Sequence, residues 1–269
     1  MKATLSILVL VLLFSPATAR AQYGATPFHD PATGEAYHIE GAIHFWHPGP
    51  DLIVASSQFE LAGTQISAAD DLGITGKNIT ELRLVLRPAK KHKFILNLLP
   101  MSYTAQSSVH RDFVFNGQTF GLNLPVATDL KWNTWTLGYE YDFLYTDRWF
   151  VGLVAQLKAT DVEVNITSPI GSEFAIAKAP IPNIGGIARV YVVPNISVTG
   201  ELIGIKIPDS VSPDYRAHYV DFDLYGTVNV TNNVGAQVGY RSLNVGYTIK
   251  KDSGTFVMKG LYFGGVVRY

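Results

Sequence analysis

Side chains alternate in polarity along several segments of this chain. Apolar residues take alternate positions over 256–269 as far as Tyr269, and the same pattern recurs over 219–230 and 79–87. Successive side chains of a β-strand point to opposite faces, so a two-residue period indicates strands with one apolar face. We find no comparably long pattern with the 3.6-residue period of a helix. The alternation therefore predicts an all-β chain.

Composition narrows the class of protein further. Only 16% of the 269 residues are charged, against about 25% in an average soluble domain. The formal net charge of −1 argues against a nucleic-acid partner. The absence of cysteine excludes a disulfide scaffold, a thiolate metal site and a cysteine nucleophile. A charge-poor chain with alternating strands fits sheets that turn one face to lipid.

The first residues have the pattern of an export signal. Lys2 precedes an apolar run over 5–14, and Ala19-Arg20-Ala21 forms a small-residue cleavage site. The run is too short for a membrane-spanning helix, which needs about twenty residues. We predict a signal peptide over 1–21, a periplasmic lead-in over 22–36 and one barrel domain over 37–269.

Turns and loops delimit ten expected strands, and the connections between successive strands are alternately long and short. The strands are expected near 37–47, 79–88, 92–106, 128–144, 149–164, 183–193, 196–207, 218–230, 234–249 and 256–269. Short turns follow alternate strands, and the longer loops between them lie near 48–78, 108–127, 166–182, 208–217 and 250–255. This arrangement is typical of transmembrane β-barrels. The predicted fold is an antiparallel up-and-down transmembrane β-barrel of about ten strands, with eight strands and a folded-over first loop as the alternative.

Aromatic residues gather around one short turn and at the end of the chain. They are Tyr139, Tyr141, Phe143, Tyr145, Trp149, Phe150 and Tyr269. Aromatic rings at strand ends suit a membrane–water interface, so we predict that these residues lie there. The alternative is the aromatic core of a soluble β-sandwich, but the regular alternation of short and long connections favours the barrel.

The signal peptide, the even strand number, the terminal Tyr269 and the hairpin segment 234–240 together resemble bacterial outer-membrane β-barrel proteins. The resemblance is to the class and matches no specific characterised family. It implies a location in the outer membrane and contact with outer-membrane lipid. It also implies that the assembly machinery recognises the last strand through its terminal aromatic residue.

If the apolar parity faces lipid, the opposite parity lines the lumen. Its charged residues are Glu40, Glu81, Arg83, Arg87, Glu140, Asp142, Lys158, Arg189, Glu201, Asp221, Asp223, Arg241 and Arg268, with His38 and His44 on the first strand. Seven carboxylates and six cations nearly balance, and barrels of about eight strands are filled by side chains. We therefore predict an ion-pair network that closes the lumen. A narrow polar path for a small solute is the alternative.

Catalysis finds little support in the sequence. Some ten-stranded outer-membrane barrels are proteases with an Asp pair and a His–Asp pair at the outer rim. Here the acidic and histidine residues that permit such a grouping are Asp70, Asp71, Asp214, His218, Asp221 and Asp223. Their presence does not define a site, because geometry does. His29, His38, His44 and His47 are too dispersed to share one metal ion, so we predict no catalytic residue, no metal and no cofactor.

The loops would carry any recognition of a partner. The first loop, 48–78, is only mildly polar, and we expect it to fold over the barrel mouth. Asn116-Gly117 predicts a hairpin within 113–120 that extends the third and fourth strands. The leading function is a non-enzymatic outer-membrane protein, either structural or a narrow passage for a small solute that can be hydrophobic. A surface-loop binding module is the alternative, and a rim-site hydrolase comes after it.

Overall fold

The computed structural model describes residues 32–55, 66–67, 71, 73–108, 112–115, 118–121, 123–169, 171–207, 215–249 and 252–269. The chain divides into two compact units, 1–30 and 31–269, and every described residue belongs to the second. The predicted signal peptide and most of the lead-in therefore lie outside the described residues. No described helix has the length and apolarity to cross a membrane.

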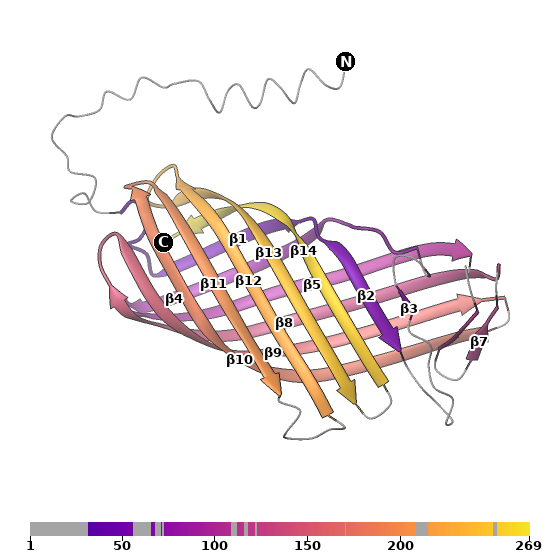
Figure 1. Ribbon diagram of the computed structural model, residues 1–269. Coiled ribbons are helices and arrows are strands. Elements are labelled where there is room, and N and C mark those ends of the chain that lie inside the picture. Colours follow the sequence, from indigo (N-terminus) through magenta and orange to yellow (C-terminus); the bar gives the residue numbers. More distant parts are fainter. Residues whose placement is uncertain are drawn as a thin grey trace, which may run out of the picture. The chain divides into compact units, whose positions relative to one another are not determined.

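The second unit is built from strands, as the alternation predicts. They are β1 (Ile39–Trp46), β2 (Gly49–Ala55), β3 (Ile66–Ser67), β4 (Ile79–Ala89), β5 (His92–Ser108), β6 (Phe113–Phe115), β7 (Gln118–Phe120), β8 (Pro125–Tyr145), β9 (Trp149–Ser168), β10 (Gly171–Val193), β11 (Ile196–Ile207), β12 (Tyr215–Asn229), β13 (Val234–Ile249) and β14 (Asp252–Arg268). Figure 1 shows the long strands side by side around the barrel.

Ten of these strands pair in the order β1-β4-β5-β8-β9-β10-β11-β12-β13-β14, and β1 pairs again with β14. The closing pair runs antiparallel from Glu40 opposite Arg268 to Trp46 opposite Tyr262. The closed ten-stranded antiparallel barrel is confirmed, and the eight-stranded alternative is wrong. Closure removes the free strand edges that an open sheet would expose.

The predicted long loop at 166–182 is wrong. β9 and β10 instead continue as a paired hairpin, with Ser168 opposite Gly171. β10 contains Pro180 and Pro182, and proline donates no backbone hydrogen bond. Both lie where β10 pairs with β9, beyond its pairing with β11, which begins at Ile184. There the missing N–H groups can face the free edge of the strand, so the prolines do not break the ladder.

The first predicted loop also contains a strand. β2 pairs with β14 over Gly49 to Ala55, directly beyond the β1–β14 pairing. Ile74, in the described segment 73–78 that leads into β4, is buried in the barrel interior. Residues 56–65 lie outside the described part, so the expectation that this loop folds over the mouth is only partly covered. What is described shows that the loop contributes both to the wall and to the core.

The half of the barrel near the short turns, called here the short-turn half, turns apolar side chains outward. On β8, Leu137, Tyr139 and Phe143 are exposed while Glu140 and Asp142 are buried. The same outward apolar residues follow the neighbouring strands, among them Leu82, Leu84, Phe94, Leu153, Leu157, Val198, Leu202, Phe222, Leu224, Val238, Leu261 and Phe263. This is the polarity of a strand between lipid and a polar lumen.

The opposite half, called here the long-loop half, reverses that polarity. Farther along the same β8, Leu130 and Trp132 are buried, whereas Asp129, Lys131 and Asn133 are exposed. The parity of the strand does not change, because its side chains still alternate. What changes is the chemistry of each face. The outer face is now polar and the inner face apolar, as in a water-soluble protein.

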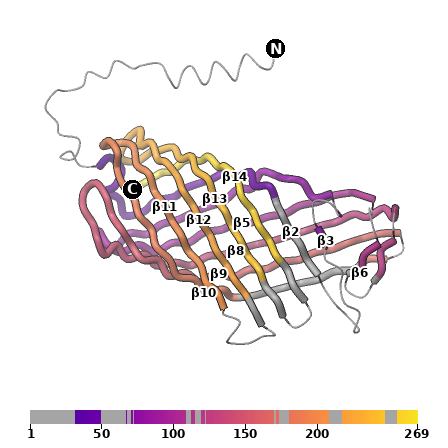
Figure 2. Tube along the Cα trace, in the orientation of Figure 1, coloured from indigo at the N-terminus to yellow at the C-terminus, as the bar shows by residue number. Residues whose placement is uncertain are grey.

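The polarity of the inner and outer faces reverses on β5 and β9 at the same level as on β8. The three strands can be followed side by side in Figure 2. On β5, Met101 and Tyr103 are buried while Ser102 and Thr104 are exposed. β5, β8, β9 and β10 contain 17 to 23 residues, whereas a tilted strand needs about 9–11 residues to cross a bilayer. Each long strand therefore has enough residues for a lipid-facing part and a water-facing part.

The apolar interior of the long-loop half is closed by the hairpin β6–β7. Phe113 pairs with Phe120, and their rings stack with centroids 5.1 Å apart. Both rings are fully buried within one apolar cluster, the upper cluster, whose buried residues include Trp46, Ile74, Leu99, Met101, Tyr103, Leu130, Trp132, Ile166, Phe256 and Met258. The hairpin predicted around 116–117 forms, but its aromatic residues fill the barrel rather than only lengthening two strands.

Candidate functional site

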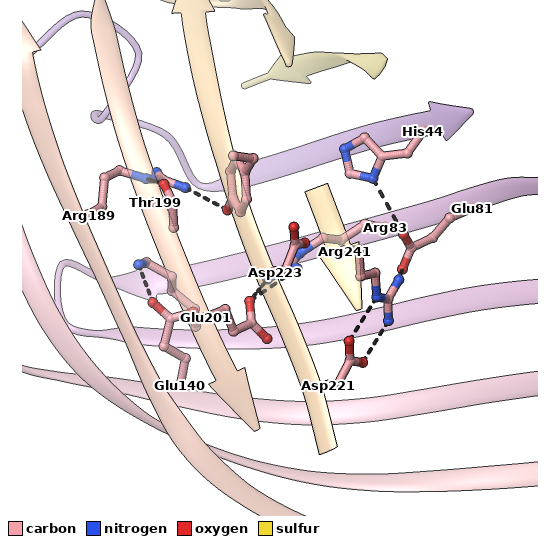
Figure 3. Close-up of polar contacts among 12 residues, drawn as sticks. His44, Glu81, Arg83, Glu140, Arg189, Thr199, Glu201, Asp221, Asp223 and Arg241 are labelled. Atoms are coloured by element: carbon pink, nitrogen blue, oxygen red, sulfur yellow. Dashed lines mark hydrogen bonds and ion pairs between the residues drawn. The ribbon is translucent and has the colours of Figure 1, made fainter. Parts of the chain in front are cut away.

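An ion-paired network fills the lumen of the short-turn half, and Figure 3 shows its centre. The Arg241 guanidinium donates to both carboxylate oxygens of Asp221, at 2.9 and 2.7 Å, and to Glu81 at 3.0 Å. Lys158 donates to the same Asp221 at 3.0 Å. These side chains come from β13, β12, β4 and β9, so the pairs cross the lumen. A bidentate guanidinium–carboxylate pair is the strongest geometry of this kind.

The network continues around Glu81 and Glu201. His44 Nδ1 lies 3.6 Å from the Glu81 carboxylate, and its Nε2 lies 2.6 Å from the amide oxygen of Gln237. Arg83 lies 3.5 Å from Glu201, from the opposite side of the barrel. His44 thus joins the charged network to an uncharged amide, a partner that the list of charged residues did not include.

A second group of charges lies closer to the short turns. Lys93 Nζ lies 2.6 Å from Glu140 and 3.0 Å from Asp142, so one ammonium serves two carboxylates on the same strand. The same ammonium lies 3.7 Å from the centroid of the Phe150 ring, a cation–π contact. Lys93 itself was missed by the sequence analysis, although it follows the inward parity of β5.

The segment 33–38, called here the N-terminal strap, seals the short-turn end. Glu35 is buried and accepts hydrogen bonds from Arg189 at 3.2 Å and from the Tyr191 hydroxyl at 2.8 Å. Arg87 donates to the Glu35 backbone carbonyl and lies 3.4 Å from its carboxylate. Sequence reasoning missed Glu35 because the lead-in has no alternation from which an inward position could be read.

The same end is closed by a pair at the barrel seam. Arg268 donates to Glu40 at 2.5 Å and to the Asn229 amide oxygen. Arg268 and Glu40 face each other across the β1–β14 pairing. The closing strands are therefore joined by an ion pair as well as by backbone hydrogen bonds.

Little space remains between the side chains at the centre of the network, around Arg241 and Glu201. The lumen cavity lined by Arg83, Lys158, Glu201 and Asp223 has a volume of about 10 Å³, roughly what one water molecule needs. Among the described residues, the amide oxygens of Asn97 and Gln156 at this cavity have no hydrogen-bond partner. At this level of the barrel the described side chains leave room for about one water molecule.

The structure places all thirteen predicted lumen charges inside the barrel, buried or nearly so. Twelve of them lie within 4 Å of an opposite charge, and Asp223 instead accepts a hydrogen bond from the Tyr262 hydroxyl at 3.0 Å. The predicted lumen position of His38 is wrong. The residue is exposed at the rim because β1 begins only at Ile39, and its Nδ1 lies 3.3 Å from the Arg87 carbonyl oxygen.

The aromatic prediction needs a similar correction. Tyr139, Tyr141, Phe143, Trp149 and Tyr269 are exposed on the outer face. Phe150 is 1% exposed and faces the lumen, because it follows Trp149 directly and adjacent strand residues point to opposite faces. Tyr145 is half-buried under Arg87, after a register shift between Tyr141 and Leu144 that changes which positions face inward.

The described residues of the rim-hydrolase alternative do not form a His–Asp pair. His218 Nε2 lies 2.9 Å from the Asn244 amide oxygen, and Asp221 is held by Arg241 and Lys158. Asp71 accepts a hydrogen bond from the Ser67 backbone N–H at 2.8 Å. Asp70 and Asp214 lie outside the described residues. Within those residues, no group of three His, Asp or Glu side chains is arranged to hold a metal ion.

No protein-family model and no curated protein matches the sequence. Among solved structures, the outer-membrane protease OmpT from Escherichia coli matches with a TM-score of 0.57 and 10% identity, over 90% of this chain and 99% of that chain. Lower TM-scores, 0.41 and 0.39, are found for the COG4313 outer-membrane channel of Pseudomonas putida F1 (12% identity, covering 91% and 100%) and for Ail of Yersinia pestis (11% identity, covering 86% and 99%). At 10% identity the match to OmpT shows the fold and not the activity. The chain has the fold of an outer-membrane β-barrel.

Proposed function

We propose that this protein is a non-enzymatic, integral outer-membrane barrel whose lumen is closed to ions and polar solutes. Its short-turn half spans the bilayer, and its short turns and both ends of the barrel domain lie on the periplasmic side. Its long-loop half stands above the outer leaflet. The reversal of polarity along β5, β8 and β9 supports this placement, because exposed Lys131 and Asn133 would be costly within the bilayer.

One observation supports the closed lumen: charged side chains from both sides pair across it, and the cavity at their centre has a volume of only about 10 Å³. A conducting pore needs a water-filled path, and open channels appear in barrels of about sixteen strands or more. The N-terminal strap places Glu35 against Arg189 at the periplasmic end as well. The barrel is therefore proposed to act as a structural membrane protein, with any recognition confined to its long-loop half.

Planar-bilayer recording of the folded full-length barrel tests this proposal. Bilayers containing the protein should stay silent at all applied voltages. Insertion is verified on the same sample by the shift in gel mobility between unheated and boiled protein. Resolved steps of ionic current would contradict the closed lumen. Recovery of the folded protein in plain buffer without detergent would contradict the membrane placement.

A second candidate function is uptake of a small hydrophobic solute by the upper cluster. Tyr103 on β5 and Thr128 on β8 are buried there, and within the described residues neither hydroxyl has a hydrogen-bond partner. Tyr103 pairs with Leu130 and Thr128 with Ala105, so the two hydroxyl-bearing residues are diagonal neighbours on the inner wall. A solute with one polar group could satisfy both hydroxyls.

Thermal unfolding with p-cresol tests the second candidate, because a ligand that binds only the folded state raises the midpoint. The increase should be lost in a Tyr103→Phe/Thr128→Val double variant and kept in Thr104→Val, an exposed position on the same β5. An equal increase in all three proteins would show non-specific partitioning and would contradict this candidate.

A further inference from the structure

An open groove crosses the outer face of β5, β8, β9 and β10 at the level where the polarity of β5, β8 and β9 reverses. Leu98, Trp135, Ala159 and Pro180 form one row across β5, β8, β9 and β10, because each is the register partner of the next. The cavity that they line has a volume of about 700 Å³. This volume is within the range of about 300–1,000 Å³ that is usual for ligand sites.

The row is hollow because a small residue stands between large ones. Ala159 lies between the Trp135 indole, which is 59% exposed, and the Pro180 ring. Nothing larger than a methyl group fills the space over β9 at this point. Pro100 adds a second proline ring to the wall of the groove, on the β5 side.

The two ends of the groove differ in chemistry. Toward the short-turn half, the outer face continues with exposed Leu137 and Leu157. In the other direction the groove is lined by Asn133 and Asp161, register partners at the first polar level of the long-loop half. One end is therefore continuous with the apolar band and the other with water. An occupant that suits both ends has a long apolar part and a polar head.

We propose that this groove binds one acyl chain of an outer-leaflet lipid, with the lipid head group at the level of Asn133 and Asp161. The assignment rests on the proposed membrane placement and adds a discrete lipid site to it. Continuity of the groove with the outward apolar band favours a lipid over a soluble ligand, which would have to leave water to enter. A phospholipid and the lipid A part of lipopolysaccharide share this acyl-chain chemistry.

Native mass spectrometry of the detergent-purified, full-length barrel tests the site. Ala159→Leu fills the groove, whereas Ala155→Leu makes the same change at another exposed alanine of β9, between Tyr139 and Ile184 and outside the groove. Wild type and Ala155→Leu should each retain one lipid per barrel, and Ala159→Leu should retain at least about tenfold less. The retained mass distinguishes a phospholipid from lipid A. Equal retention in all three proteins, or none in the folded wild type, would overturn the proposal.

Quenching of Trp135 fluorescence by brominated lipid distinguishes two results: an error in the proposed lipid site and an error in the proposed membrane placement. In a Trp149→Phe background, Trp135 is the only largely exposed tryptophan, since Trp46 and Trp132 are buried. Phosphatidylethanolamine with brominated acyl chains, titrated into vesicles of unbrominated lipid, should quench Trp135 with saturation at a low mole fraction. Ala159→Leu should remove the saturation and leave quenching proportional to the mole fraction. If quenching of the wild type is also proportional to the mole fraction, the lipid site is wrong and the membrane placement stands. If no quenching occurs, both the lipid site and the membrane placement are wrong.

Discussion

The two halves of this barrel have the same wall and opposite chemistry. In the short-turn half, Arg241, Asp221 and Glu81 pair inside a wall whose outer face is apolar. In the long-loop half, Trp132 and Phe256 pack inside with ring centroids 4.0 Å apart, and the outer face is polar. The difference teaches that the medium outside the wall decides which kind of interior the strand can enclose. On the proposed placement, lipid outside leaves the polar residues for the lumen, and water outside leaves the apolar ones.

The largest expected effect is in the charged half. Arg241→Ala leaves Asp221 and Glu81 without their shared guanidinium in a buried site, and breaking such a pair costs about 3–5 kcal/mol. Urea unfolding of the barrel in lipid vesicles measures the loss. A decrease below about 1 kcal/mol, the usual value for a surface pair, would mean that water reaches this part of the lumen.

The matching change in the apolar half removes volume instead of charge. Leu130→Ala should lower the free energy of unfolding by about 3 kcal/mol, since it opens a cavity in a packed core. Leu137→Ala, on the outer face of the same β8, should cost less than half as much because lipid fills the space. Equal costs in the same unfolding assay would contradict the assignment of inner and outer faces.

An added charge locates the boundary between the halves. Leu137→Arg places a guanidinium in the outward apolar band and should cost about 2 kcal/mol, whereas near the interface the cost falls to about 0–1 kcal/mol. Asn133→Arg, two outward positions farther along β8, should therefore be nearly neutral. The two variants share the strand, the face and the introduced residue. A difference between their unfolding free energies therefore reports the medium around each position. Similar costs would place both residues in one medium.

The smallest expected effect comes from an exposed charge of the long-loop half. Lys131 is the cross-strand partner of Glu163 on the outer face. Lys131→Ala should change the free energy of unfolding by about 0.5 kcal/mol or less, as is typical of solvated pairs. A loss near that of Arg241→Ala would show that this face is not in water.

Alternation in the sequence was sufficient to predict the closed barrel and the inward position of residues such as Arg241 and Glu201. It did not reveal that the two faces exchange polarity along β8, because a two-residue period is the same whichever face is apolar. The exchange is visible in hindsight, since Asp129 and Lys131 share the parity of Leu137. Long-range partners such as Glu35 could not be found, because an irregular segment has no period from which its direction can be inferred.

The N-terminal strap has a consequence for how the barrel seam opens. Its Thr33 N–H donates to the Pro194 carbonyl at 2.7 Å, its Gly34 N–H to the Asn232 side chain at 3.1 Å, and its His38 N–H to the Tyr269 carbonyl at 2.6 Å. These partners belong to two different hairpin turns and to the last residue of the barrel. All three hydrogen bonds can be made at once only when every strand is in place, so the complete strap belongs to the closed barrel. Opening the seam between β1 and β14 therefore also breaks the hydrogen bond from the strap to Tyr269.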